Sequence, residues 1–186
     1  MILAVTGMPI ESELQRMLTE TRINDWLHED VFHFKWWLLL SFCIFAVSLW
    51  WKLLNKRRLP DIALYAVLAT VVMMGVDEYG TELILWDYPT YLMPIFPSIT
   101  AVNLALFPMI FSLVYQKFMT WQSYICSSLV AAGLLAFIVE PFLTYGSYYQ
   151  LLNWTYYYSF LLYIAVALLV KGLLVKIYTL TARAQK

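Results

Sequence analysis

The chain has 186 residues, of which 62% are hydrophobic, 18% aromatic and only 13% charged. A soluble domain carries roughly 25% charged residues, so this composition, with a mean hydropathy of +0.70, excludes an ordinary soluble enzyme and predicts an integral membrane protein. The net charge is zero, and basic-aromatic patches of the kind that bind nucleic acid are missing, so we expect no nucleic-acid partner.

The first 33 residues form a polar segment that precedes the first long apolar run. Apolar residues such as Leu14, Met17 and Leu18 recur there at roughly helical spacing between charged positions. This pattern is typical of an amphipathic helix that lies on a membrane surface. We therefore predict an extracytoplasmic amphipathic segment over residues 1–33, followed by a membrane domain over residues 34–186.

Apolar segments in the membrane domain are long enough to cross a bilayer as helices, which takes about 20 residues, or fewer where flanking lysine or arginine side chains reach the interface. The sequence thus predicts an all-α protein whose core is a bundle of five transmembrane helices. The expected spans are residues 34–54, 60–76, 98–115, 121–143 and 155–178.

Basic residues set the expected orientation of this bundle. They concentrate in the connection between the first two spans (Lys52, Lys56, Arg57 and Arg58), after the third span and after the fifth. With five spans all three places fall on one side, which the positive-inside rule makes cytoplasmic. The sequence therefore predicts an N-terminus outside and a C-terminus inside.

Acidic residues gather at the end of the second span, where Asp77, Glu78, Glu82 and Asp87 lie within eleven positions. The simplest interpretation is topological, because an outward-facing loop tolerates acids. If the helix continues past residue 76, Glu78 and Glu82 repel one another one turn apart. A hard divalent cation, a basic partner or solvent would relieve that repulsion. A divalent cation is therefore possible and its identity open; no other cofactor is evident.

Glu140 is an acidic residue inside the fourth predicted span, and charged groups at that depth usually face the bundle interior. Cys126, Leu129, Gly133 and Ala136 precede it at spacings of three and four, which predicts that all five lie along one helix-packing face. Pro141 follows directly, and we expect it to bend or end the helix.

Two interpretations of Glu140 stay open beside simple exposure to lipid. In the first it is a buried carboxyl group that Asn103, Asn153 or a tyrosine satisfies by hydrogen bonding. In the second it is a cation or proton ligand at the outer mouth of a cavity, with Asn103 at a comparable depth in the third span. Aromatic residues crowd the same side, in "ILWDYPTYLMPIF" and "TYGSYYQLLNWTYYYSF". They are expected either as interface anchors or as walls of an outward-facing pocket.

The second half of the chain resembles a family of small multi-pass membrane proteins from spore-forming Gram-positive bacteria. The likeness lies in "WDYPTYLMPIFPSITAVNLALFPMIFSLVYQ", Trp121 and "VEPFLTYGSYYQLLNWTYYYSF", and covers roughly residues 80–170. The resemblance implies a bacterial plasma membrane. It carries over no activity and no functional residue.

We predict a membrane protein that works as an accessory or structural component of a larger complex, without a catalytic residue. It would contact the lipid bilayer and a membrane protein partner or further copies of itself. The alternative is a small transporter or channel component, or an outward-facing ligand or cation sensor. Its candidate polar site comprises Glu140, Asn103, Asp77, Glu78, Glu82 and Asp87.

Overall fold

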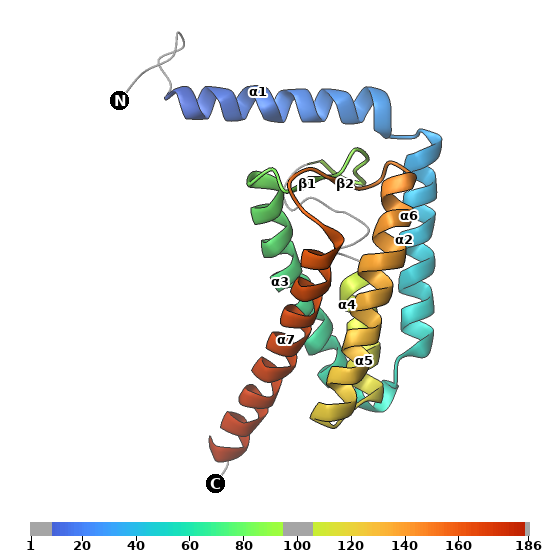
Figure 1. Ribbon diagram of the computed structural model, residues 1–186, viewed down its shortest axis with the longest axis vertical. Coiled ribbons are helices and arrows are strands. Elements are labelled where there is room, and N and C mark those ends of the chain that lie inside the picture. Colours follow the sequence, from blue (N-terminus) through green and yellow to red (C-terminus); the bar gives the residue numbers. More distant parts are fainter. Residues whose placement is uncertain (1–8, 95–105, 185–186) are drawn as a thin grey trace.

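The computed structural model describes residues 9–94 and 106–184. Four helical segments in these residues are long and apolar enough to cross a bilayer: Phe34–Leu53, Lys56–Glu82, Trp121–Tyr145 and Tyr156–Ala184. They run between the same two ends of the molecule (Figure 1). The all-α class is therefore confirmed, and the chain has the features of a multi-pass membrane protein.

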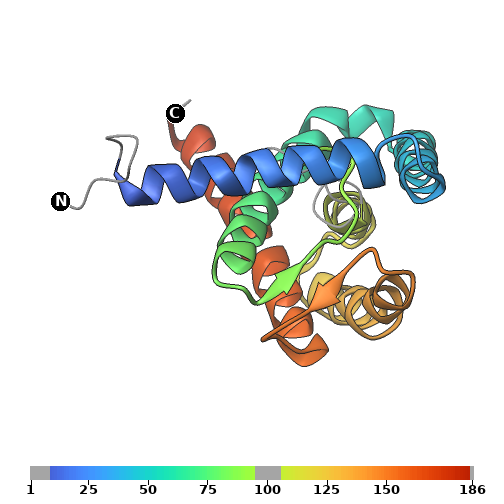
Figure 2. The same cartoon turned by 90° about the horizontal axis from the view of Figure 1, so that it is seen from above.

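A separate helix, α1 (Ile10–Asp25), lies across one end of the bundle (Figures 1 and 2). We call this the α1 end and the other the opposite end. None of the residues of α1 is buried, and its place on a membrane surface stays a prediction. A π-helical turn, Trp26–Asp30, redirects the chain into the first long helix.

The long helices differ from the predicted spans mainly at their ends. Helix α2 (Phe34–Leu53) begins and ends as expected. Helix α3 (Leu59–Glu82), entered through the 3₁₀ turn Lys56–Arg58, continues past the predicted end at residue 76. Helix α7 (Tyr156–Ala184) likewise extends beyond residue 178. Backbone hydrogen bonding continues through the polar residues beyond both predicted ends, which in α3 include the buried Asp77 and the exposed Glu78 and Glu82.

The third predicted span, 98–115, falls largely on residues outside the described part of the chain. Its described portion is α4 (Phe107–Lys117), which contains Pro108. Five spans therefore stay a prediction, and Asn103 lies outside the described residues.

The fourth long helix consists of α5 (Trp121–Leu134), a π-helical turn (Leu135–Val139) and α6 (Glu140–Tyr145). Pro141 was expected to bend or end this helix; the helix does not end there, and a bend stays a prediction. The proline ring would clash with the carbonyl group four residues earlier in a regular α-helix. The wider π turn directly before it accommodates the ring, and the helix continues to Tyr145.

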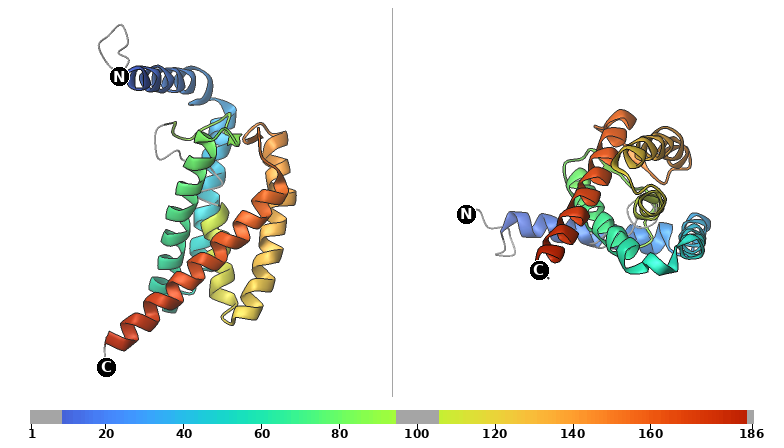
Figure 3. Two further views of the ribbon diagram at one scale, coloured as in Figure 1. Left: turned by 60° about the vertical axis from the view of Figure 1, so that its left-hand side comes forward. Right: turned by 90° about the horizontal axis from the view of Figure 1, so that it is seen from below.

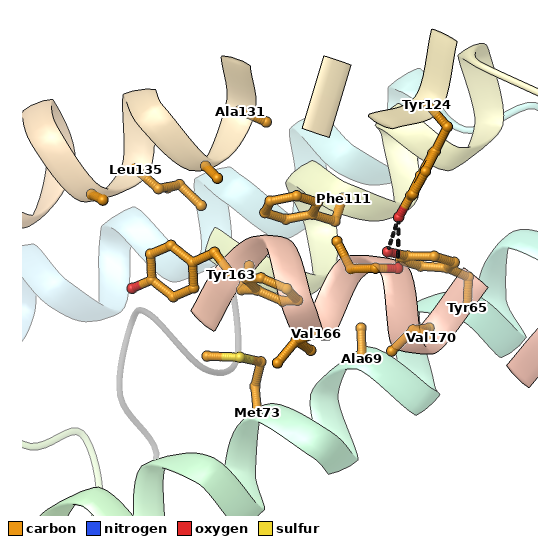
Figure 4. Packing of buried hydrophobic residues seen from close by; sticks show 14 of the residues in the cluster. Tyr65, Ala69, Met73, Phe111, Tyr124, Ala131, Leu135, Tyr163, Val166 and Val170 are labelled. Carbon is orange, nitrogen blue, oxygen red and sulfur yellow. Dashed lines mark hydrogen bonds between the residues drawn. The ribbon is translucent and has the colours of Figure 1, made fainter. Parts of the chain in front are cut away.

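The core lies where α3, α4, α5 and α7 pack together (Figure 4). Its buried tyrosines are hydrogen-bonded: the Tyr124 hydroxyl donates to the Ala167 carbonyl (3.0 Å) and pairs with the Tyr65 hydroxyl (2.7 Å). Helix α7 is inclined to its neighbours (Figure 3). Helix α2 packs mainly against α4 and is the least buried of the four long helices.

Two short strands join the connections at the α1 end. Strand β1 (Trp86–Asp87) follows α3, and β2 (Gln150–Leu151) precedes α7. They pair antiparallel, with Trp86 opposite Leu151 and Asp87 opposite Gln150, and lie side by side, to one side of α1 when seen from above (Figure 2). Indole donors of Trp26 and Trp36 bind the carbonyl groups of Tyr91 (3.1 Å) and Leu92 (3.3 Å), which ties this layer to the N-terminal segment.

Candidate functional site

Asp77 is a buried carboxyl group on α3, one and a half turns before that helix ends at the α1 end. Its Oδ1 atom accepts hydrogen bonds from the Tyr88 hydroxyl (2.5 Å) and from the Trp86 indole (3.2 Å). Two donors on one carboxylate oxygen favour the charged form and fix its orientation. The helix that was expected to stop at residue 76 is what carries Asp77 into this position.

A close approach at Gly80 brings Trp86 over α3. After the helix ends, Ile84 takes a left-handed conformation (φ 55°) and the Leu85 amide donates to the Gly80 carbonyl (2.9 Å), which folds the chain back along α3. The indole ring of Trp86 then occupies the space that a side chain at Gly80 would need. Glycine at this position is therefore required for the indole to reach Asp77.

Glu140 is the second buried carboxyl group, only 2% exposed. Its Oε1 atom accepts a hydrogen bond from the Tyr163 hydroxyl (2.5 Å) of α7. Within the described residues its Oε2 atom has no hydrogen-bond partner of good geometry, although the Ser159 hydroxyl lies beside the carboxyl group. A tyrosine was one of the partners proposed from the sequence, and Tyr163 is the partner of one of the two oxygen atoms of Glu140.

The packing face that carries Glu140 differs from the one expected. Cys126 and Leu129 are exposed, so the predicted face was wrong. A series of buried residues runs at four-residue steps, with Ala131 and Leu135 buried beside it: Tyr124, Ser128, Ala132, Ala136 and Glu140. Such steps drift about 40° each around a regular helix. The π turn at residues 135–139 has more residues per turn and reduces that drift, so Glu140 stays on the buried side.

The β1–β2 pair brings the two carboxyl groups into one polar environment. It places Trp86 and Tyr88 beside Tyr149, and these rings pack as one cluster. They enclose a cavity of about 20 Å³, whose polar walls come from Asp77, Tyr88, Tyr149, Ser159 and Tyr163. That volume accommodates roughly one water-sized particle. Asp77 lines this cavity directly, and Glu140 bonds to one of its walls.

Electrostatic contacts link the same groups. Burial raises the pKa of the Tyr149 hydroxyl above its usual range, and the charges of Glu140 and Asp77 raise it further. Burial, with the charge of Asp77 second, does the same to the pKa of Tyr88. Both phenols therefore stay protonated and serve as donors. Among the described residues that line the cavity there is no lysine, arginine or histidine.

We name Asp77, Tyr88, Glu140, Tyr149, Ser159 and Tyr163 the carboxyl–tyrosine cluster. It contains two acids from separate helices, four hydroxyl groups and a cavity of the size of one water, all at the α1 end. Such an arrangement supplies oxygen ligands and negative charge to a small cation or proton.

The structure separates the other acids of the predicted site from this cluster. Glu78 and Glu82 are exposed on α3. Asp87 is half-buried and accepts a hydrogen bond from the Tyr91 hydroxyl (3.1 Å). Asn153, proposed as a partner of Glu140, donates to the Ile84 carbonyl (3.1 Å). Within residues 9–94 and 106–184, no three His, Cys, Asp or Glu side chains are arranged to hold a metal ion.

Sequence reasoning named the aromatic stretches around residues 84–96 and 144–160 as possible pocket walls, and Trp86, Tyr88 and Tyr149 come from them. It missed Tyr163, which lies in the middle of an apolar span. The available signal is spacing: Ser159 and Tyr163 are four residues apart on α7, so they share one face of that helix. A polar pair of this kind on an apolar helix indicates a buried partner.

Comparisons of this chain with protein-family models, with curated proteins and with solved structures found no match. The site is therefore interpreted from its own geometry and chemistry.

Proposed function

We propose that this membrane protein is an outward-facing sensor that binds a small monovalent cation, a proton or Na⁺, in the carboxyl–tyrosine cluster. The observation that carries the proposal is the burial of two carboxyl groups at one tyrosine-walled cavity. Asp77 lines the cavity, Glu140 is bonded to its wall residue Tyr163, and no described wall residue is basic. Two ionised carboxyl groups in a medium of low dielectric repel one another and lose hydration. A bound cation offsets both costs.

Size and ligand chemistry favour a monovalent ion over the divalent cation considered from the sequence. Calcium takes six to eight oxygen ligands, and magnesium keeps several waters. The cavity of about 20 Å³ has room for one small particle only, and only two carboxyl groups of the described residues belong to the cluster. A proton or one partly dehydrated Na⁺ fits these limits better.

Sensing is favoured over transport by the packing on the far side of the cluster. Between it and the opposite end, the described core is mostly apolar, with Phe107, Phe111 and Leu174 fully buried. Its buried polar groups are single residues such as Ser112 and Ser128, together with the Tyr65–Tyr124 pair. A transport pathway needs a continuous series of polar or hydrated positions at these depths.

The outward orientation rests on charge distribution. The connection between α2 and α3, the connection between α4 and α5, and the C-terminal end of α7 all lie at the opposite end (Figure 1). They carry most of the basic residues, so the positive-inside rule places that end in the cytoplasm and the cluster outside. With the family resemblance, we infer a bacterial plasma membrane.

The test is thermal unfolding of the purified protein in detergent, titrated with Na⁺ against choline at constant ionic strength, and separately with pH, K⁺, Mg²⁺ and Ca²⁺. A cation at a hundred times its dissociation constant adds about 2.7 kcal/mol of stability. We expect saturable stabilisation by Na⁺ or by protons in the wild type. It is lost in Asp77→Asn and Glu140→Gln, whose folding is checked by circular dichroism.

The matched control is Glu78→Gln/Glu82→Gln, which removes two exposed acids from the same helix as Asp77. This control keeps the full response if the cluster is the site. An equal loss of response in the control, or a wild type that responds to no ion and to no pH change, contradicts the proposal. Stabilisation by Mg²⁺ or Ca²⁺ alone reinstates the divalent site.

A second candidate function, the accessory component of a larger membrane complex, is favoured by α2. This helix is the least buried of the long helices, and Trp37 and Phe45 are exposed on it. A partner helix or a second copy of the chain would cover that face. Light scattering in detergent tests the second copy: Trp37→Ala/Phe45→Ala should convert a dimer to a monomer, whereas a monomeric wild type excludes it.

A further inference from the structure

An apolar groove of about 500 Å³ lies between α2 and the turn that leads into α6. One wall is formed by Leu38, Leu39 and Phe42, and the other by Ile138 and Phe142. Leu39 is buried, whereas Ile138 (60%) and Phe142 (74%) are largely exposed. Both walls belong to predicted membrane spans, so the groove opens to the hydrocarbon region of a bilayer.

A basic residue lies at the α1 end of this groove. Lys35 is on the same face of α2 as Leu39 and Phe42, at spacings of four and seven residues. Its ammonium group lies 5.9 Å from the ring centre of Tyr148, a residue that lines the groove.

The ammonium group of Lys35 forms no salt bridge within the described residues, where ion pairs join only Arg16 to Glu20 and Arg58 to Asp61. Charged neighbours act on it at longer range. Burial raises the pKa of the Asp30 carboxyl group, and the charges of His33 and Lys35 act in the opposite direction. Asp30 therefore acts on Lys35 at longer range without pairing with it, and the ammonium group stays available to an anion at the membrane interface.

We propose that the groove binds an anionic phospholipid of the leaflet at the α1 end, with one acyl chain between α2 and α6 and the phosphate at Lys35. Seven residues separate Lys35 from Phe42, about 10 Å along a helix. The charged group thus lies at headgroup level and the apolar walls below it. A phospholipid has the same order, because its phosphate lies at headgroup level and its acyl chains extend from there into the hydrocarbon region.

A single acyl chain is narrow and flexible, and it can follow walls made of branched and aromatic side chains. The inference is independent of the carboxyl–tyrosine cluster, which faces the other side of α6.

Native mass spectrometry of the detergent-purified protein tests the proposal with phosphatidylglycerol and phosphatidylcholine that carry identical chains. We expect one phosphatidylglycerol to bind saturably and more tightly than phosphatidylcholine. A basic residue near the surface contributes about a fivefold preference for anionic lipid. Lys35→Gln should remove that preference, whereas Lys176→Gln, which changes an exposed lysine toward the opposite end of α7, should keep it.

The groove itself is tested by filling it. Ile138→Trp places a large ring between the walls and should abolish saturable binding of both lipids. Val130→Trp is the matched control, because Val130 is equally exposed (65%) on the same long helix but does not line the groove. Glycerol phosphate, which has no chain, should not compete.

Equal affinities for the two lipids in the wild type, or an anionic preference unchanged by Lys35→Gln, overturn the assignment of the phosphate to Lys35. Saturable binding that survives Ile138→Trp in a folded protein overturns the assignment of the chain to the groove. Thermal unfolding of each variant establishes that it is folded before lipid is added.

Discussion

Two glycines of α3 provide a matched test of how the candidate site is assembled. In Gly80→Ala the new methyl group overlaps the Trp86 ring, whereas at Gly75 no atom lies within 4 Å of the added carbon. Alanine stabilises a helix interior by about 1 kcal/mol relative to glycine. Gly75→Ala should therefore raise the free energy of unfolding by up to about 1 kcal/mol.

Gly80→Ala should have the opposite sign. Overpacking costs about 1–3 kcal/mol, and loss of the indole hydrogen bond to a charged Asp77 costs about 1.5–3 kcal/mol. After the helix gain of about 1 kcal/mol, the net loss is roughly 1.5–5 kcal/mol.

The assay for both variants is unfolding in mixed micelles, with indole N–H resonances recorded by ¹⁵N NMR in parallel. In Gly80→Ala the resonance of Trp86, assigned by Trp86→Phe, should shift away from its hydrogen-bonded position. Gly75→Ala should leave it unchanged. If the two variants change stability in the same direction, or if the Trp86 resonance is unchanged in Gly80→Ala, Trp86 does not depend on Gly80 for its position and the reasoning is refuted.

Three further outcomes follow from single side chains. Lys171 donates to the Met119 carbonyl (3.1 Å) and contacts those on either side, so Lys171→Ala should lower the free energy of unfolding by about 1–3 kcal/mol. Lys176→Ala, at an exposed position, should change it by less than about 0.5 kcal/mol; equal effects would refute a capping role. Tyr124→Phe should cost about 1 kcal/mol in the same assay, and a neutral result would show that its two buried hydrogen bonds contribute nothing. Burial raises the pKa of Asp30, so the folded protein binds this proton more tightly than the unfolded chain does. The free energy of unfolding therefore falls as the pH rises from the unfolded to the folded pKa of Asp30. Asp30→Asn should remove this fall in a pH series of unfolding curves, and an unchanged slope would contradict the assignment.

Most of the helical framework could be predicted because long apolar runs have few alternatives in a bilayer. The ends of α3 and α7 could not, because hydropathy reports which residues lie in lipid and not where hydrogen bonding stops. Burial of Glu140 followed from the cost of a lipid-exposed charge. The face around it did not, because the π turn changes the helical spacing that the pattern assumes.

The grouping of the acids was harder to predict. Asp77 and Glu78 are adjacent in the sequence, yet one is buried and the other exposed, since neighbouring residues on a helix point about 100° apart. The β1–β2 pairing brings Tyr149 into the cavity that Asp77 lines. The two strands belong to connections more than 60 residues apart in the sequence. Nothing local in either connection specifies it. Tyr163 likewise required knowing which face of α7 meets α6.

The central claim is that Asp77 and Glu140 act as one binding unit, and a double-mutant cycle tests it most directly. The free energies of unfolding of the wild type, Asp77→Asn, Glu140→Gln and the double variant are measured at one pH and one Na⁺ concentration. Because either substitution removes part of the same cation site, we predict a coupling energy above about 0.5 kcal/mol, with the double variant losing less than the sum of the single losses. Effects that add within about 0.3 kcal/mol would mean that the two carboxyl groups are independent buried acids, and would contradict the account.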